Sequence, residues 1–296
     1  MKRCLTGGDQ GSQAVTSPQT ETKAARDAWD RSAAGWDEHA PVIRRWLYTA
    51  TQAMLDMAAI GPGSRVLDVA AGAGDQTLDI AQRVGPQGRV LATDLSPLIL
   101  ERAKSNCRRA GCAQVETLVG DAEELAVEPA SFDAAVSRLG LMLFPHPLRA
   151  IRAMHAALRP AGGVCTMVFG RPERNPCITI LMRTALEHAG LPMREPMQPG
   201  SLLSLGQPSR LDGLFREAGF SNVATTLIDA PFALPSAREY VEFVRSSASP
   251  VQQILSGLEP DKQLAAWDDI EAQLARFQSP SGWIGPNELA LTAARR

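Results

Sequence analysis

The sequence contains Val66-Leu67-Asp68-Val69-Ala70-Ala71-Gly72-Ala73-Gly74-Asp75, an apolar strand that runs into a glycine-rich turn and then into a helix. Glycine lacks a Cβ, so Gly72 and Gly74 let the backbone approach a bound ligand. The next apolar strand ends at Asp94, 20 residues after Gly74, where a carboxylate can accept both hydroxyls of an adenosine ribose. The pattern predicts a nucleoside-binding turn at the end of a sheet.

Strands and helices alternate around this motif. The expected strands are 65–69, 89–93, 114–119, 132–137 and 163–169, and the expected helices are 75–84, 97–110 and 147–158. Such alternation implies right-handed crossovers and a parallel sheet covered on both faces. Two later strands, 223–232 and 288–292, are expected to form a hairpin-like edge whose connection is a helical insertion. We therefore predict an α/β fold with a doubly wound, mostly parallel, seven-stranded sheet.

The rest of the chain is expected to divide around this core. Residues 1–22 lack apolar periodicity and predict a flexible tail. The predicted parts that follow are N-terminal helices that cover the site (23–62), an α/β core (63–170), a helical cap (171–207 and 234–286), and the remaining helix and edge strands of the sheet (208–233 and 287–296).

Composition excludes several classes of function. Thirty Lys and Arg against 32 Asp and Glu, without a basic run, disfavour a nucleic-acid partner. The sequence contains no stretch of 18 apolar residues, so we expect neither a membrane span nor a secretion signal. The five cysteines form no C-x-x-C pair, which is typical of a cytoplasmic protein with reduced thiols. The sequence shows no cluster of metal-ligating residues, so we expect no metal. A homodimer is left open.

A third motif, Gly120-Asp121-Ala122, follows the third expected strand. An aspartate here can accept a hydrogen bond from the amino group of adenine, while the next backbone N–H donates to the ring. The alternative is a structural aspartate that only caps a short helix. Because the motif follows the first two in order, we favour adenine binding.

The competing ligand is a nicotinamide or flavin dinucleotide. A dinucleotide fingerprint requires a third glycine where this chain has Thr77. Asp75 also stands at the helix N-terminus, and its carboxylate would repel a pyrophosphate. S-adenosylmethionine carries no phosphate, so the sequence favours this cofactor and leaves a dinucleotide-dependent oxidoreductase as the alternative.

The order of these motifs, with Ser137-Arg138-Leu139-Gly140-Leu141-Met142 and Leu158-Arg159-Pro160-Ala161-Gly162-Gly163, resembles class I S-adenosylmethionine-dependent methyltransferases. It is most similar to the ubiquinone/menaquinone-biosynthesis type and its natural-product relatives, over roughly residues 25–170 and more loosely from about 208. The resemblance implies a Rossmann-like methyltransferase fold with helical cap insertions. It also implies methyl transfer to oxygen or carbon of a small aromatic, quinone-like or polyketide-like acceptor.

The resemblance also implies a set of cofactor-binding positions. These are Asp68, Ala70, Gly72, Gly74, Asp94, Leu95, Asp121, Ala122, Ser137 and Arg138. Asp68 would reach the methionine ammonium, directly or through water, and the turn that follows it would lie under the methionine and ribose. Asp94 would hold the ribose, Asp121 the adenine, and the backbone at Ser137 and Arg138 the methionyl part. The chain departs from the family where Ala70 and Ala161 replace usual glycines.

The acceptor side carries weaker signals. His146, after the fourth strand, is the candidate general base, with a solvated loop histidine as the alternative. Apolar residues of the N-terminal and cap helices predict a lid over an apolar acceptor, or else the filling of a second small core. They are Trp29, Trp36, Met182, Leu191, Met193, Met197, Phe243 and Trp267. A module that binds the cofactor without turnover is a third hypothesis.

Overall fold

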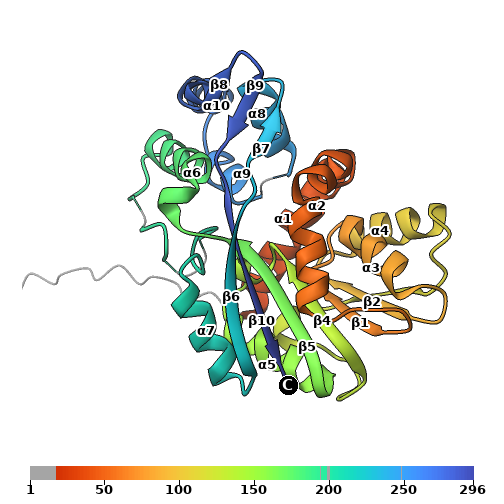
Figure 1. Ribbon diagram of the computed structural model, residues 1–296. Coiled ribbons are helices and arrows are strands. Elements are labelled where there is room, and N and C mark those ends of the chain that lie inside the picture. The colour runs from red at the N-terminus through yellow and green to blue at the C-terminus, as the bar shows by residue number, and fades with distance from the viewer. Residues whose placement is uncertain (1–17, 194, 199–200, 248) are drawn as a thin grey trace, which may run out of the picture.

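A computed structural model describes residues 18–193, 195–198, 201–247 and 249–296. Its main body is a seven-stranded sheet of order β3-β2-β1-β4-β5-β10-β6 (Figure 1). The strands are β1 (Arg65–Val69), β2 (Arg89–Asp94), β3 (Val115–Val119), β4 (Phe132–Arg138), β5 (Leu158–Phe169), β6 (Ser221–Asp229) and β10 (Glu288–Arg295). Strands β1 to β5 pair in parallel, whereas β10 runs antiparallel to both β5 and β6. The predicted seven-stranded, mostly parallel sheet is confirmed.

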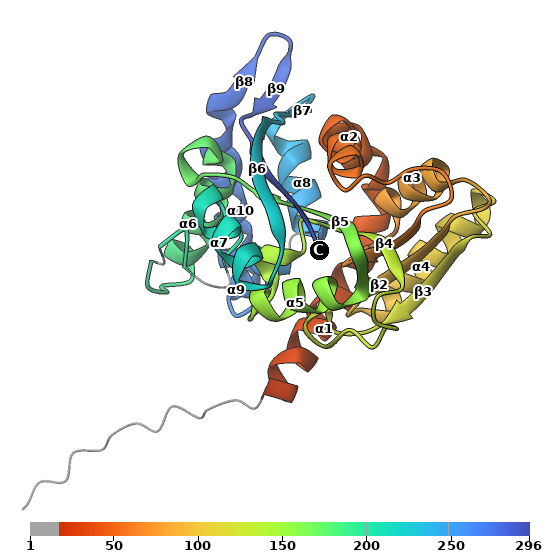
Figure 2. The same cartoon turned by 60° about the horizontal axis from the view of Figure 1, so that its bottom comes forward.

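Helices cover both faces of this sheet. On one face lie α2 (Ala40–Met57), α3 (Asp75–Val84) and α4 (Pro97–Arg109), and on the other lie α5 (Pro147–Ala157) and α7 (Pro208–Glu217). Figure 2 shows α5 and α7 on the opposite side of the strands from α2 and α3. Helix α4 begins where the sequence predicts, because the Ser96 hydroxyl accepts a hydrogen bond from the backbone N–H of Ile99 at 3.1 Å.

The N-terminal boundary differs from the prediction. Helix α1 (Pro18–Glu38) begins five positions before residue 23, so residues 18–22 are helical and do not belong to a tail. Proline is favoured in a first helical turn, where its missing N–H costs nothing. The residues after Pro18 are mostly polar, so the start of this helix lacks the apolar periodicity from which a helix is predicted in a sequence. Residues 1–17 of the expected tail lie outside the described residues.

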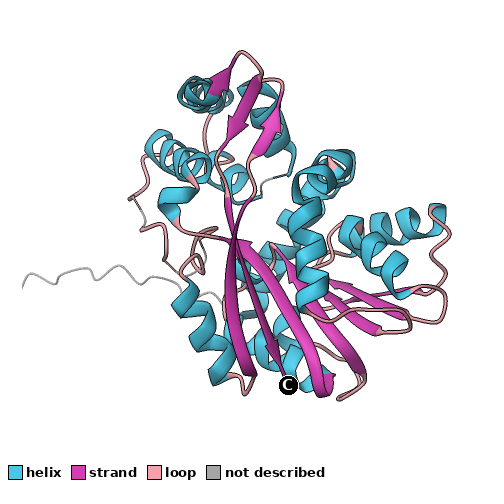
Figure 3. Ribbon diagram, in the orientation of Figure 1, coloured by secondary structure: helices cyan, strands magenta, loops and turns pink. Residues whose placement is uncertain are grey.

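The cap lies beyond the carboxyl end of β5 and contains more than helices. Its helices are α6 (Pro176–His188), α8 (Ala237–Ser247), α9 (Ser249–Leu255) and α10 (Pro260–Leu274). A separate sheet of order β7-β9-β8 stands beside them, as Figure 3 shows at the top of the molecule. Its strands are β7 (Phe232–Leu234), β8 (Gln278–Ser279) and β9 (Gly282–Gly285). Of the described helices, none is both long enough and apolar enough to cross a bilayer.

One expectation for the cap is wrong. The expected strand over 223–232 ends at Asp229, and Phe232 begins β7 of the second sheet. The predicted boundary between 233 and 234 consequently cuts through β7.

A buried carboxylate joins the cap to the large sheet. Glu288, the first residue of β10, has a side chain only 4% exposed, and it accepts hydrogen bonds from Arg171 Nε at 2.9 Å and from the Arg171 backbone N–H at 3.1 Å. Asn175, fully buried, donates from its amide to the carbonyls of Arg171 and Glu288. The chain that leaves the sheet after β5 is thus tied to the chain that returns in β10.

Substitution of this carboxylate should change how stability depends on pH. Hydrogen bonds from Arg171 lower the pKa of Glu288 below its ordinary 4.5. The ionised form therefore stabilises the fold above pH 4.5, and this contribution is lost as the pH falls through the lowered pKa. We expect Glu288→Gln to lower the free energy of unfolding at pH 7 by about 1–2 kcal/mol. The difference in free energy of unfolding between the variant and the unaltered protein should become smaller below pH 4. Urea denaturation from pH 7 to 3 measures both curves, and parallel curves would contradict the assignment.

Candidate functional site

A cavity of about 1540 Å³, open to solvent, lies at the carboxyl ends of β1, β2, β3 and β4. The strand order reverses between β1 and β4, the position where open α/β sheets bind ligands. We call it the acidic cavity, because its lining includes Asp75, Asp94, Asp121, Glu123 and Glu124. Most of the predicted site residues line it, namely Ala70, Gly72, Asp94, Leu95, Asp121, Ala122, Arg138 and His146. Asp68, Gly74 and Ser137 do not.

The glycine-rich turn serves two purposes. Ala70, Gly72 and Gly74 all have positive φ, at 57°, 58° and 87°. Gly72 lines the cavity, and a Cβ there would meet no other atom within 4 Å, so this glycine leaves the backbone open to a ligand. Gly74 instead faces α4, where a Cβ would lie 2.9 Å from the Cβ of Ala103. The close packing on α4 accounts for this glycine, which does not line the cavity.

Asp94 holds the turn against the neighbouring strand. Its carboxylate accepts hydrogen bonds from the backbone N–H of Gly72 and of Ser96, each at 3.0 Å. Burial raises the pKa of Asp94, and these backbone hydrogen bonds oppose the rise. Because the carboxylate lines the cavity, oxygen lone pairs not used by the backbone can receive a ligand's hydroxyls.

Asp68 lies behind the turn and not in the cavity. It is fully buried, and it accepts hydrogen bonds from the Thr77 hydroxyl at 2.7 Å and from the Gln76 amide. Burial raises the pKa of Asp68 to about 6. Gln76 does line the cavity, so hydrogen bonding links Asp68 to a ligand only through this neighbour. No sequence motif pointed to Gln76, which the structure adds to the site.

Asp121 fits both interpretations of its motif. It caps the short helix η1 (Ala122–Glu124) by accepting a hydrogen bond from the Glu123 N–H at 2.9 Å, and it also lines the cavity. His146 stands nearby at the rim, with its backbone N–H bonded to the Glu123 carboxylate. The side chain of His146 is exposed, as the solvated-loop alternative expected.

The charge of Asp75 is balanced. Arg138 at the end of β4 forms a buried ion pair with Asp75 and donates to the Thr51 hydroxyl at 3.0 Å. The expected repulsion of a pyrophosphate by Asp75 is therefore offset, a correction that the sequence could not supply because Arg138 follows Asp75 by 63 residues. The identity of the ligand depends on the other features of the site.

The turn after β4 approaches the turn after β1 closely. Leu139 has a φ of +57°, and a Cβ on Gly140 would lie 2.6 Å from the Cβ of Ala70. The Ser137 hydroxyl is buried just beneath, and no described residue bonds to it. Gly140 is thus required by the alanine that replaces the usual glycine at position 70.

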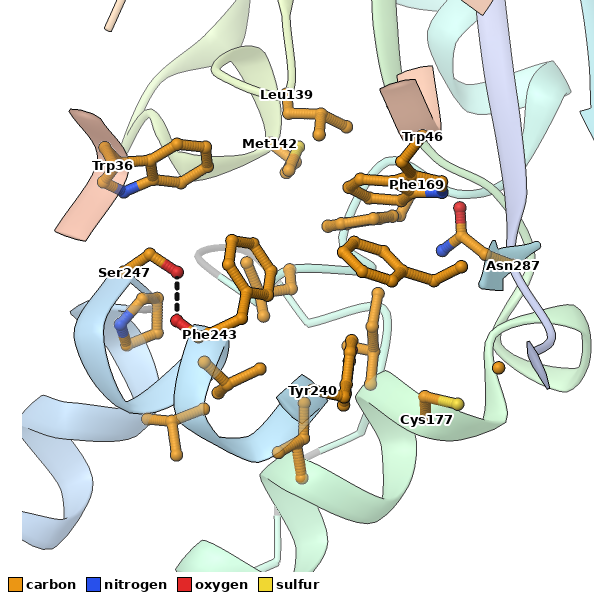
Figure 4. Close-up of a pocket in the computed structure, with 18 of the residues that line it drawn as sticks. Trp36, Trp46, Leu139, Met142, Phe169, Cys177, Tyr240, Phe243, Ser247 and Asn287 are labelled. Carbon is orange, nitrogen blue, oxygen red and sulfur yellow. Dashed lines mark hydrogen bonds between the residues drawn. The ribbon is translucent and has the colours of Figure 1, made fainter. Parts of the chain in front are cut away.

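A second cavity, of about 800 Å³, lies between the sheet and the cap (Figure 4). Eight aromatic residues line it, and we call it the aromatic cavity: Trp29, Trp36, Trp46, Phe169, Phe232, Tyr240, Phe243 and Trp283. Of its lining residues in the described part of the chain, none is Asp, Glu, His, Lys or Arg. The cavity is therefore apolar and uncharged.

The two cavities adjoin. Trp29 and Trp36 of α1, with Leu139 and Leu143 after β4, line both. Helix α1 is held over this junction by Asp30, which accepts hydrogen bonds from the Ser96 hydroxyl and from the Leu98 N–H. A ligand in one cavity can thus reach a ligand in the other.

Some of the residues named for a lid or a second core line the aromatic cavity. Trp29, Trp36 and Phe243 line the aromatic cavity, whereas Trp267 packs in the core of the cap. Leu191 and Met193, at 45% and 55% exposure, point to solvent. Trp46 and Trp283 were missed, since the first lies on a helix that reads as core and the second on a strand too short to predict.

The match to a known protein family falls within the α/β core of the chain. Residues 66–162 match a family model described as a methyltransferase domain. A ubiquinone/menaquinone biosynthesis C-methyltransferase from Ectopseudomonas mendocina is 30% identical over 119 residues, which are 40% of this chain and 46% of that relative. The chain spans about half the length of the curated relatives that it matches.

Solved structures show likeness over more of the chain. The YcgJ protein of Bacillus subtilis aligns with 84% of this chain and 98% of its own, with a TM-score of 0.56 at 17% identity. Phosphoethanolamine N-methyltransferase 2 of Haemonchus contortus, in complex with phosphomonomethylethanolamine and S-adenosylhomocysteine, aligns with 92% of this chain and 60% of its own, with a TM-score of 0.57 at 17% identity. At 17% sequence identity, the structural similarity to these two proteins is evidence for the fold alone.

The contact between the two turns can be tested by paired substitutions. We expect Gly140→Ala to lower the free energy of unfolding by about 1–3 kcal/mol, because the added methyl overlaps the Cβ of Ala70. Ala70→Gly should be neutral or slightly stabilising, since glycine tolerates positive φ. The double variant should recover most of the loss. Denaturant titration of the four proteins gives the coupling, and additive effects would rule the contact out.

Proposed function

Because residues 66–162 form a class I S-adenosylmethionine-dependent methyltransferase domain, we propose that this chain transfers a methyl group from S-adenosylmethionine to oxygen or carbon of a small, uncharged aromatic acceptor. The acidic cavity is the cofactor site in this proposal, and the aromatic cavity is the acceptor site. When bound, S-adenosylmethionine supplies a methyl group on a positively charged sulfur.

The residues of the acidic cavity suit that cofactor. Asp94 presents a carboxylate for ribose hydroxyls, and Asp121 presents one for an adenine amino group, with the N–H of Ala122 beside it. Gly72 leaves the backbone of the turn open. The positively charged groups of the cofactor are matched by a lining in which five acidic side chains outnumber the arginines Arg138 and Arg149.

The observation that carries the choice of acceptor is the uncharged aromatic lining of the second cavity. An aliphatic amine, with a pKa of about 10, enters as an ammonium, and the uncharged lining offers that charge no partner, whereas a phenol or an activated ring carbon enters uncharged. Burial raises the pKa of Tyr240, and raises that of Cys177 to about 12, so both side chains keep their protons. With no described base in the lining, the proton that the acceptor loses passes to solvent through the adjoining acidic cavity in this proposal.

His146 is not assigned as the base in this proposal. It lines the acidic cavity beside Asp121, at the proposed adenine end, and it does not line the aromatic cavity. Rate enhancement is then assigned to alignment and exclusion of water by the aromatic walls. A cytoplasmic location and a homodimer stay predictions from the sequence.

Binding and turnover test the proposed function directly. We expect the purified chain to bind S-adenosylhomocysteine and not NADH in calorimetry, and to methylate naphthols in the presence of S-adenosylmethionine, as mass spectrometry would detect. Asp94→Ala should weaken S-adenosylhomocysteine binding at least tenfold, because each ribose hydrogen bond to a carboxylate contributes about 1.5–3 kcal/mol. Asp261→Ala, at the exposed start of α10, is the control. Tight NADH binding without S-adenosylhomocysteine binding would refute the proposal.

The raised pKa of Asp68 predicts a pH dependence of cofactor binding. Only the ionised carboxylate attracts the ammonium of S-adenosylhomocysteine, so affinity should rise as the pH increases through about 6. Asp68→Asn should remove most of this rise, because the amide has no charge to lose. Calorimetric titrations between pH 5 and 7.5 measure both slopes, and equal slopes would show that Asp68 is not involved.

A further inference from the structure

Asn287 is a polar residue in the wall of the aromatic cavity, in the loop between β9 and β10. In Figure 4 it lies across the cavity from Trp36, which belongs to the end shared with the acidic cavity. Its backbone carbonyl accepts a hydrogen bond from the Ala230 N–H at 2.8 Å. The main chain that carries this side chain is therefore fixed.

The hydrogen-bond network also fixes which way the amide of Asn287 is turned. Asn175 donates both amide protons to backbone carbonyls, so its Oδ1 must act as the acceptor. That oxygen receives the Glu288 N–H at 3.1 Å and Asn287 Nδ2 at 2.7 Å. A flipped Asn287 would set two oxygens against each other. Its Nδ2 must accordingly face Asn175.

This orientation leaves Asn287 Oδ1 without a partner. The atom is buried, and no described residue donates a hydrogen bond to it. A buried carbonyl oxygen that lacks a donor carries a cost comparable to a lost hydrogen bond. Asn287 lines the cavity while the oxygen itself is buried, so a ligand in the cavity can supply the missing donor once the side chains around the oxygen shift.

We propose that Asn287 Oδ1 determines acceptor specificity by accepting a hydrogen bond from a hydroxyl of the acceptor, at the end of the molecule opposite the methylated atom. This inference rests on the proposed function and narrows its acceptor class. The acceptor is then a flat, uncharged aromatic molecule with two polar groups at opposite ends. One is the nucleophile beside the junction of the cavities, and the other is the donor to Asn287.

The surroundings favour a neutral donor over an ammonium. The charged groups nearest to Asn287 are already paired, because Glu288 is bonded to Arg171 and lies within 3.8 Å of Arg174. The other titratable groups around the cavity are Cys177 and Tyr240 in its wall and His39, whose ring packs on Phe243. None of these offers a counter-ion to a cation, and the proposed methyl donor is itself positively charged.

A matched series of acceptors tests the inference on the unaltered protein. The series is 1,5-dihydroxynaphthalene, 1-naphthol and 5-methoxy-1-naphthol, which keep one nucleophilic hydroxyl and change only the distal group. We expect kcat/KM, and affinity in the presence of S-adenosylhomocysteine, to be at least about tenfold higher for the dihydroxy compound than for the other two. This exceeds the factor of two that two equivalent hydroxyls would give. The methoxy compound cannot donate a hydrogen bond and should gain nothing.

A variant assigns the preference to one atom. Asn287→Leu keeps the approximate volume and removes the acceptor oxygen, so the preference for the dihydroxy compound should fall to about twofold. Gln278→Leu, which removes an amide from the exposed small sheet of the cap, should retain the tenfold preference. Thermal melting checks that both variants are folded. If Asn287→Leu does not fold, the series on the unaltered protein decides alone.

The outcomes separate the two proposals. Methylation or binding of all three compounds with equal efficiency would overturn the role of Asn287 and leave the proposed function standing. Binding of S-adenosylhomocysteine without binding or methylation of any of the three would overturn the proposed aromatic acceptor itself. A tenfold preference that survives Asn287→Leu would also overturn the role of Asn287.

Discussion

The site depends on one half-buried carboxylate that accepts backbone hydrogen bonds from two neighbouring turns. Asp94 receives the N–H of Gly72 from the turn after β1 and the N–H of Ser96 from the start of α4. Both groups would otherwise be unpaired at the sheet end, and the carboxylate would be a partly desolvated charge without compensation. The two N–H groups and the carboxylate therefore satisfy one another, and these hydrogen bonds hold the turn, the helix start and the acidic cavity in one arrangement.

The two cavities divide the chemistry between them. Acidic side chains gather in one, and the other is walled by stacked rings such as Trp46 on Phe169 and Tyr240 on Trp283. A reaction in which positive charge disappears is favoured where the reacting centre lies in surroundings that solvate charge poorly. In the proposed methyl transfer the aromatic cavity therefore favours the chemical step, and the acidic cavity contributes binding of the cofactor.

Local patterns in the sequence sufficed for the sheet and most of the acidic cavity. Strands such as Arg65–Val69 are short apolar runs, and Asp94 and Asp121 stand directly after such runs. What the patterns did not predict are contacts between distant segments. The pairing of Asp75 with Arg138, the place of Gly74 against Ala103, and the burial of Asp68 behind Gln76 all depend on tertiary packing. The cap was harder still, because strands of two to four residues carry no periodicity.

The helix that bears Trp29 and Trp36 forms part of the wall of both cavities. Its polar contacts are spread along its length, because Asp30 accepts hydrogen bonds from the start of α4, Ser32 donates to Gln252 of α9, and Asp37 accepts from Asn106. A displacement of this one helix would therefore reshape the surroundings of both reactants together.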